Sequence, residues 1–391
     1  MLINKTLETL ARCSALRSEL SGVPVYVVGG AVRDSLLGKT PREYDFAFAA
    51  DAETFLQRNP SARKVGRSIS VILWNGQEYM PLEGSLEKDL CRRDLTVNAL
   101  AVDGRGELFA HPEALGDLKS HVFRPASPES FLHDPVRVFR LARLSCEWPG
   151  FRIHPEAVVQ MRDTAAAGAL EAVPAERLVR EFMKALAAPR PSRWLEVLRE
   201  GGCLAQWFPE LEQAASIPAG PSPFHSGSVF QHTLETMDGM AGDPLGVWMA
   251  LCHDLGKTCT PSEMLPHHYG HEQTGAKLAV RLAERLGMPA RFCGAGETAS
   301  LLHMKAGIYQ ELRFGTRCDL LMKVHAAGLD EPFWRLVDTD GGRPLMAAAM
   351  RDLEIILTVS LPPRWRNRGR DSGKKLRELR CQALANHKAR L

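Results

Sequence analysis

The feature that most constrains the fold is a strand-like run that ends in two glycines and turns into a helix. Val27 and Val28 are β-branched, Gly29 and Gly30 follow, and helix-like residues continue to Gly38. Glycines at such a turn let the backbone approach an anionic group closely, and the free N–H groups of a helix start attract it. The segment predicts an α/β unit with a phosphate site at the end of a strand.

Two carboxylates follow this turn closely. Glu43 and Asp45 are two residues apart, so in a strand both would point to one side while Phe46 and Phe48 pack on the other. Carboxylate oxygens beside a phosphate site are suitable ligands for Mg²⁺. The pair indicates an enzyme that handles nucleoside triphosphates.

Charge is distributed unevenly along the 391 residues, which are enough for two or three domains. The net charge is only +3, but residues 364–391 hold ten Lys and Arg against two acidic residues. Such a segment suits a phosphate backbone, and the alternative is a frayed terminus that aids solubility.

The cysteines and the N-terminus bear on the compartment. Nine cysteines without a C-x-x-C pair favour free thiols in a reducing environment. Charged residues at 5, 8, 12 and 17 leave no apolar signal-peptide core, and no apolar run is long enough to span a bilayer. We expect a cytoplasmic protein without a membrane segment.

Hydrophobic periodicity gives a coarse map of the chain. It predicts a helix over 5–20, strands near 25–28, 44–49, 69–74 and 99–102, and helices from about 134 onward. We expect four parts: an α/β head at 1–125, a helical neck at 126–222, a histidine-rich helical domain at 223–345 and a basic tail at 346–391.

Two more clusters in the first half carry suitable chemistry. Arg93, Asp94 and Asn98 offer donors for phosphates and side chains for ribose hydroxyls, although a surface salt-bridge patch is the alternative. Asp134 and Arg137 are neighbours at i, i+3 on an expected helix and could read the edge of a base, or form a simple ion pair.

Together these segments resemble the class II tRNA nucleotidyltransferases. The resemblance covers, in family order, Gly29-Gly30-x-Val32-Arg33-Asp34, Glu43-x-Asp45, Arg92-Arg93-Asp94-x-x-x-Asn98-Ala99, Gly116-Asp117-Leu118, Asp134-x-x-Arg137 and Glu176-Arg177. It implies an enzyme that adds C and A to tRNA 3′ ends without a nucleic-acid template. The implied partners are tRNA, CTP and ATP, the implied cofactor is Mg²⁺, and the oligomeric state is left open.

The resemblance also assigns roles. Glu43 and Asp45 would be the catalytic metal ligands, and the nucleotide would be bound by Gly29, Gly30, Arg33, Arg93, Asp94, Asn98, Asp134, Arg137 and Arg140.

This chain departs from the family pattern at several positions. Glu43 stands where the family usually has Asp, His133 replaces the acid before the base-reading Asp134, and His111-Pro112 replaces Asp-Pro. The twelve residues Met80–Cys91 are fewer than in relatives that build the whole CCA end, where a flexible loop helps the pocket switch from C to A. The short segment resembles enzymes that add only CC, and an ordinary loop deletion is the alternative.

The histidine-rich part carries a second constellation. His253-Asp254 follows an apolar run, with His232 upstream and Asp340 downstream. Imidazoles and carboxylates are ligands for Zn²⁺, Ni²⁺, Mn²⁺ or Mg²⁺, and a helical bundle can bring them together. The pattern resembles the HD phosphohydrolase superfamily, which implies metal-dependent phosphatase and 2′,3′-cyclic phosphodiesterase activity.

Other acidic and histidine residues are less informative. His225, His267 and His325 are expected at the surface, and Asp338 is the alternative to Asp340. His303 is followed by Met304 where an acid would be expected, so a second metal is not predicted.

The expected fold class is α+β: a polymerase-β-like nucleotidyltransferase head, a mostly α-helical neck and body, and a helical HD domain. Two other functions stay open. One is a poly(A) polymerase of the same class, and the other is an RNA-binding HD phosphodiesterase with a weakened transferase head.

Overall fold

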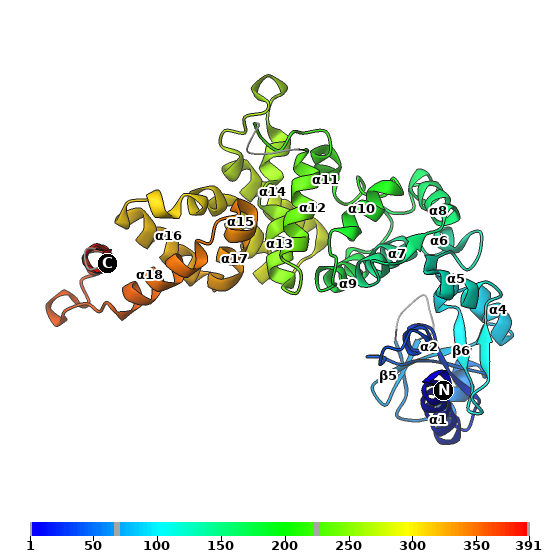
Figure 1. Ribbon diagram of the computed structural model, residues 1–391. Helices are drawn as coiled ribbons and strands as arrows, with labels where there is room; N and C mark the ends of the chain where they lie inside the picture. The colour runs from blue at the N-terminus through cyan, green and yellow to red at the C-terminus, as the bar shows by residue number, and fades with distance from the viewer. Residues whose placement is uncertain (1, 66–70, 222–226, 389–391) are drawn as a thin grey trace. The chain divides into compact units, whose positions relative to one another are not determined.

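The computed structural model describes residues 2–65, 71–221 and 227–388 (Figure 1). It divides into two compact units. Unit 1 comprises Met1–Leu141 and Gly150–Leu170, and unit 2 comprises Ala142–Pro149 and Glu171–Leu391. The four-part division expected from the sequence stays a prediction.

Unit 1 is built on a seven-stranded sheet in the order β3-β4-β5-β2-β1-β6-β7. The strands are β1 Val25–Val28, β2 Asp45–Phe48, β3 Arg63–Val65, β4 Val71–Trp74, β5 Gln77–Pro81, β6 Leu100–Val102 and β7 Leu108–Ala110. Among the described strands of this sheet, β2 and β5 pair in parallel and the other neighbours are antiparallel, and β1 lies between β2 and β6. Strands were predicted at β1, β2, β4 and β6, while residues 69 and 70 of the expected third strand lie outside the described residues.

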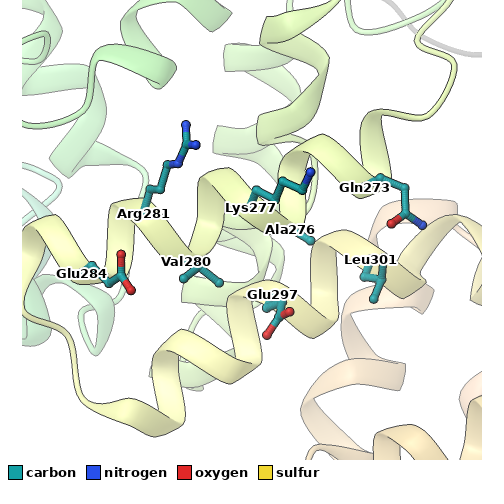
Figure 2. Close-up of a pocket in the computed structure, with 8 residues that line it drawn as sticks. All are labelled: Gln273, Ala276, Lys277, Val280, Arg281, Glu284, Glu297 and Leu301. Carbon is teal, nitrogen blue, oxygen red and sulfur yellow. The ribbon is translucent and has the colours of Figure 1, made fainter.

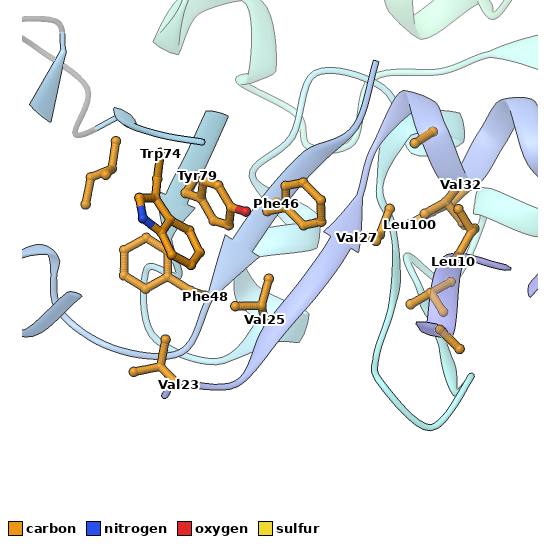
Figure 3. Packing of buried hydrophobic residues seen from close by; sticks show 14 of the residues in the cluster. Leu10, Val23, Val25, Val27, Val32, Phe46, Phe48, Trp74, Tyr79 and Leu100 are labelled. Carbon is orange, nitrogen blue, oxygen red and sulfur yellow. The ribbon is translucent and has the colours of Figure 1, made fainter. Parts of the chain in front are cut away.

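Aromatic side chains fill one face of this sheet (Figure 3). Phe46 stacks on Tyr79 with ring centroids 4.8 Å apart, and Phe48 contacts Phe55. Ala47 belongs to the core on the opposite face. The alternation predicted for β2 is therefore confirmed, and it turns Asp45 away from the aromatic core.

Unit 1 also contains helices and two minor strands. They are α1 Leu2–Ser21, α2 Gly30–Leu36, α3 Ala52–Arg58, α4 Leu86–Cys91, α5 Ala114–Ser120, α6 Ser130–His133, the first half of α7 Val136–Glu147, α8 Pro155–Ala166, and the pair β8 Val122–Phe123 and β9 Arg152–Ile153.

The short segment Met80–Cys91 is largely regular structure. Its first two residues end β5, and its last six form α4, whose first turn is capped by the Ser85 hydroxyl accepting from the Lys88 N–H. Only residues 82–85 connect the two elements, so little of this segment is loop.

Unit 2 is helical. Its longer helices are α9 Ala175–Leu186, α10 Arg193–Glu200, α11 Pro209–Ala214, α12 Val229–Gly239, α13 Pro244–Cys252, α14 His271–Leu286, α15 Ala290–Gly307, α16 Phe314–Ala326, α17 Asp330–Gly341, α18 Met346–Thr358 and α19 Arg370–Lys388. All residues of α13 from Leu245 to Cys252 are buried, because its neighbours α12, α15 and α17 enclose it.

The described part of the basic C-terminal segment is mostly helical and packs on other helices of unit 2. Its helix α19 packs on α16 and α18, and Arg377 forms a two-bonded ion pair with Asp319 at 2.6 and 2.7 Å. Within the described residues, no helix is long and apolar enough to cross a membrane.

Candidate active sites

The glycine turn of the head has the backbone that its sequence predicts. Gly29 caps α2 with φ +71°, a conformation that other residues rarely adopt, and its N–H donates to the Leu100 carbonyl at 2.9 Å. A Cβ on Gly29 would lie 3.3 Å from Arg93 Nη1, and one on Gly30 would lie 3.5 Å from Arg33 Nη2. Two guanidinium groups therefore flank this turn.

A buried polar network joins four of the predicted nucleotide-binding residues. Arg33 Nη1 donates to Asn98 Oδ1 at 2.5 Å, and Asn98 Nδ2 donates to Asp94 Oδ1 at 3.1 Å. Arg140 forms an ion pair with Asp94 Oδ2 at 3.0 Å. Burial alone would raise the pKa of Asp94, but Arg140 and the hydrogen bonds outweigh it and lower the pKa to about 2.

Arg137 contacts backbone oxygens in a way that the sequence did not reveal. Its guanidinium donates to the carbonyls of Arg92 at 2.7 Å, Arg93 at 3.3 Å and Ser130 at 3.1 Å. Arg93 in turn donates to Asp89 at 3.1 Å. Arg137 thus holds the segment that carries Arg93, while Asp134 accepts the Arg137 N–H through its backbone carbonyl at 2.9 Å.

Asp45 lies at the strand end nearest the glycine turn. It begins β2 and pairs in register with Val28, the last residue before Gly29. Glu43 lies two residues earlier, outside the strand, and is exposed. The register therefore places one predicted metal ligand beside the predicted phosphate site.

The substituted position before the base reader is at the surface. His133 approaches Glu129 at 3.7 Å, and both side chains are about two-thirds exposed. An exposed pair of this kind contributes little to stability.

The histidines of unit 2 converge as predicted. His232 comes from α12, His253 directly follows α13, and Asp340 comes from α17. His232 Nε2 is 2.8 Å from Asp340 Oδ1 and 3.2 Å from His253 Nε2. These three residues offer ligand atoms within 4.8 Å of one another.

Asp254 connects this triad to a second one. Its Oδ2 is 3.3 Å from His253 Nε2 and 3.5 Å from His232 Nε2, whereas its Oδ1 is 3.4 Å from both His271 Nε2 and His303 Nε2. Asp254, His271 and His303 are all buried and form a second group that could hold a metal ion. One carboxylate therefore faces both groups.

Backbone carbonyls fix the orientation of three of these imidazoles. The Nδ1 atoms of His253, His271 and His303 lie 2.6, 2.6 and 2.9 Å from the carbonyls of Ala250, His268 and Ser300. Because a carbonyl only accepts, each Nδ1 carries a proton and each Nε2 faces the cluster, where it could bind a metal ion in place of a second proton. Metal-binding histidines are commonly held in this way.

The carboxylates of the cluster need a positive charge nearby. Burial alone would lower the pKa of His253, but Asp254 and Asp340 outweigh it and raise the pKa to about 10. The pKa of Asp254 is lowered well below its ordinary value by His253 and the buried ammonium of Lys257, which lies 2.7 Å from Oδ2, against the opposing effect of burial. The donor set and its charge suit a divalent cation.

A close approach of two backbones assembles the second group. A Cβ on Gly256 would lie 1.9 Å from the His271 carbonyl, and one on Gly275 would lie 2.3 Å from Ser300 Oγ. Glycines at both positions let the short helix after Asp254 pack against the start of α14.

Several other predictions can be placed. Asp338 accepts from the backbone N–H groups of Leu345 and Met346 at 2.7 and 3.0 Å, so it caps α18 and Asp340 is the residue that joins the triad. His325 pairs with Asp330 at 2.7 Å. His267 is exposed, and His225 lies outside the described residues.

His271 and His303 are the site residues that sequence reasoning left out. Met304, the reason for discounting His303, is 53% exposed and points away from the buried side of α15. Helical periodicity could have placed His303 in the interior, because it lies on the buried side of α15 with Ala299, Leu302 and Ala306.

A groove of about 430 Å³ between α14 and α15 is separate from both clusters (Figure 2). Its lining combines Lys277 and Arg281 with Glu284 and Glu297, and none of the predicted site residues lines it.

Comparison with known proteins defines the class. Residues 25–73 and 57–124 match the "Poly A polymerase head domain" model, and 150–215 match "Probable RNA and SrmB-binding site of polymerase A". The fold is similar to that of the Thermotoga maritima CCA-adding enzyme complexed with tRNA, with a TM-score of 0.67 at 17% identity over 98% of this chain and 94% of that one. The Bacillus stearothermophilus CCA-adding enzyme in complex with CTP gives 0.63 at 21% identity over 89% and 81%. The chain has the fold of these two enzymes, and its first part matches a poly(A) polymerase head.

Sequence relatives give the family. The multifunctional CCA protein of Aromatoleum aromaticum is 36% identical in an alignment that covers 83% of this chain and 86% of the relative. That of Halorhodospira halophila is 32% identical, with coverage of 92% and 96%. The chain belongs to the family of the multifunctional CCA proteins.

Proposed function

We propose that this protein adds C and A to the 3′ ends of tRNA without a nucleic-acid template. The observation that carries the proposal is the 36% identity to a multifunctional CCA protein across 83% of the chain. The buried network of Arg33, Asn98, Asp94 and Arg140 beside the Gly29 turn supports it.

In this proposal the head positions the reactants. Arg33 and Arg93 flank the triphosphate, and Asp134 and Arg137 pair with the incoming base. Mg²⁺ held by Glu43 and Asp45 would neutralise charge at the α-phosphate. The tRNA 3′ oxygen forms a new bond to the α-phosphorus, loses its proton and displaces pyrophosphate.

The proposal also concerns which nucleotides the enzyme adds, C alone or C and A. The name of the relatives favours a complete CCA end, whereas the short connection between β5 and α4 favours CC alone.

Purified protein with Mg²⁺ should be given tRNA transcripts ending at the discriminator base, at C and at CC, with CTP, ATP or both. We expect incorporation, and sequenced 3′ ends decide between CC and CCA. Long A tracts would identify a poly(A) polymerase instead, and no incorporation with any transcript would overturn the transferase.

We also propose that unit 2 carries a metal-dependent HD phosphohydrolase acting on 2′,3′-cyclic phosphates. The geometry that supports it is Asp254 lying between the two groups of imidazoles. His232, His253, Asp254 and Asp340 would hold one divalent ion, and His271 and His303 would complete a second site with Asp254. Bound Zn²⁺, Ni²⁺ or Mn²⁺ would supply an activated water and stabilise negative charge on phosphate.

Metal content tests this site directly. After dialysis against Mn²⁺, Ni²⁺ or Zn²⁺, the wild type should retain metal and hydrolyse 2′,3′-cyclic AMP, and His253→Gln should lose both. His325→Gln, which removes a surface histidine, serves as the matched control and should retain both. A wild type that binds no metal would contradict the proposal.

The division into head, neck, HD domain and tail, and a cytoplasmic location, belong to the same proposal. The free cysteines support the second of these.

A further inference from the structure

An exposed aromatic pair lies immediately before the second metal group. The rings of His267 and Tyr269 stack with an interplanar angle of 11° and centroids 5.8 Å apart. Tyr269 is 78% exposed, more than any other large hydrophobic residue in the described part of the chain. Two residues later α14 begins with His271.

The residue between the two rings anchors this segment. His268 Nε2 donates to the Pro218 carbonyl at 2.8 Å, and its Nδ1 accepts from the Thr260 hydroxyl at 2.8 Å. Its own carbonyl accepts from His271 Nδ1 at 2.6 Å. His268 therefore holds the backbone, so that its two neighbours are exposed while His271 is oriented toward Asp254.

A tyrosine exposed to this extent contributes little to the stability of the fold, because an aromatic ring stabilises a fold mainly by burying its surface. Tyr269 and His271 are two residues apart, so their Cα atoms are separated by at most about 7 Å. A nucleotide places its base one sugar away from its phosphate. The base of a nucleotide whose phosphate binds at the cluster would therefore lie at a distance comparable to this backbone separation.

We propose that Tyr269, supported by His267, is a stacking platform for the base of nucleotides hydrolysed at the HD centre. The inference rests on the proposed hydrolase and adds to it the residue that would hold the base of a nucleotide substrate. Since every base has a π-face, the platform selects for a base without selecting strongly among bases.

The test compares a substrate with a base and one without. Wild type, Tyr269→Ala, Tyr269→Phe and His267→Ala are assayed on 2′,3′-cyclic AMP and on methyl riboside 2′,3′-cyclic phosphate, which has the same sugar and phosphate but no aromatic ring, in the same metal. Tyr269→Ala should raise KM for 2′,3′-cyclic AMP about 5- to 20-fold with little change in kcat. It should leave the rates on the baseless ester within about twofold, a tolerance we take from the usual size of surface substitutions.

Control variants separate stacking from folding. Tyr269→Phe keeps the ring and should behave as the wild type, and His267→Ala should give a smaller increase in KM. Leu357→Ala removes another exposed apolar side chain in unit 2 and should leave KM and kcat unchanged for both substrates.

The other outcomes overturn the inference in distinguishable ways. Unchanged KM in Tyr269→Ala, with both substrates hydrolysed, would reject the platform and leave the hydrolase standing. An equal loss on both substrates would show that Tyr269 only maintains the structure. A wild type that hydrolyses neither substrate in any of the metals would reject hydrolase and platform together.

Discussion

At the scale of single residues, Asp94 controls how the head responds to acid. In the folded chain its pKa is lowered to about 2, although burial opposes the effect of Arg140. In the unfolded chain an aspartate titrates near 3.9, at about the ordinary value. The ionised carboxylate therefore stabilises the head above about pH 4, and this stabilisation is lost as the pH falls toward 2.

We expect Asp94→Asn to lower the stability of the head by about 2 kcal/mol at pH 7. The difference from wild type should shrink below pH 4, because the unfolded wild type then takes up a proton at Asp94 that the folded chain does not bind. Scanning calorimetry of the full chain between pH 7 and 3 measures this. Asp371→Asn, an exposed residue of unit 2, is the control, and a difference that is constant with pH would refute the argument.

At the scale of elements, the contact between Gly256 and the start of α14 decides whether the second metal group forms. A Cβ at Gly256 would lie 1.9 Å from the His271 carbonyl, which neither backbone can accommodate without moving. Gly256→Ala should therefore separate Asp254 from His271 and His303.

We expect Gly256→Ala to reduce the metal retained after dialysis and to lower the melting temperature of the full chain. Gly294→Ala is a suitable control, since the space around that position in α15 is open and alanine favours a helix. Metal content by mass spectrometry and thermal unfolding provide the readouts. Normal metal content in Gly256→Ala would show that the close approach is dispensable.

Elements also show what the sequence could predict and what it could not. Strand β1, the Gly29 turn and the alternation in β2 follow local periodicity, so they were predictable. The hydrogen bonds of Arg137 were harder to predict, because its acceptors include backbone carbonyls, which carry no residue-specific signal. His271 and His303 were missed because they meet Asp254 only when α14 and α15 pack together.

At the scale of the whole molecule, the two proposed activities depend on different residues. Asp45 belongs to unit 1 and His253 to unit 2. Asp45→Ala should reduce nucleotide incorporation by at least about 100-fold, since charge neutralisation is a large part of such catalysis, and leave cyclic-phosphate hydrolysis intact. His253→Ala should do the reverse.

Both assays on each variant check this prediction, with circular dichroism to show that the fold is kept. Loss of hydrolysis alone in His253→Ala, together with no effect of Asp45→Ala on any activity, would favour an RNA-binding phosphodiesterase with a weakened head. Loss of both activities in either variant would mean that the two centres are not independent.

The path of the chain has a consequence for how these activities can be separated. Residues 142–149 belong to unit 2, yet residues 150–170 return to unit 1, so the polypeptide passes between the units after Leu141, Pro149 and Leu170. The first of these crossings falls inside α7. A chain that ends after Leu170 holds all of unit 1 but keeps residues 142–149 of unit 2, and a chain that starts at Ala142 holds all of unit 2 but keeps residues 150–170 of unit 1. Truncation at any one point therefore leaves part of one unit attached to the other or divides a unit, whereas single substitutions can silence each centre in place.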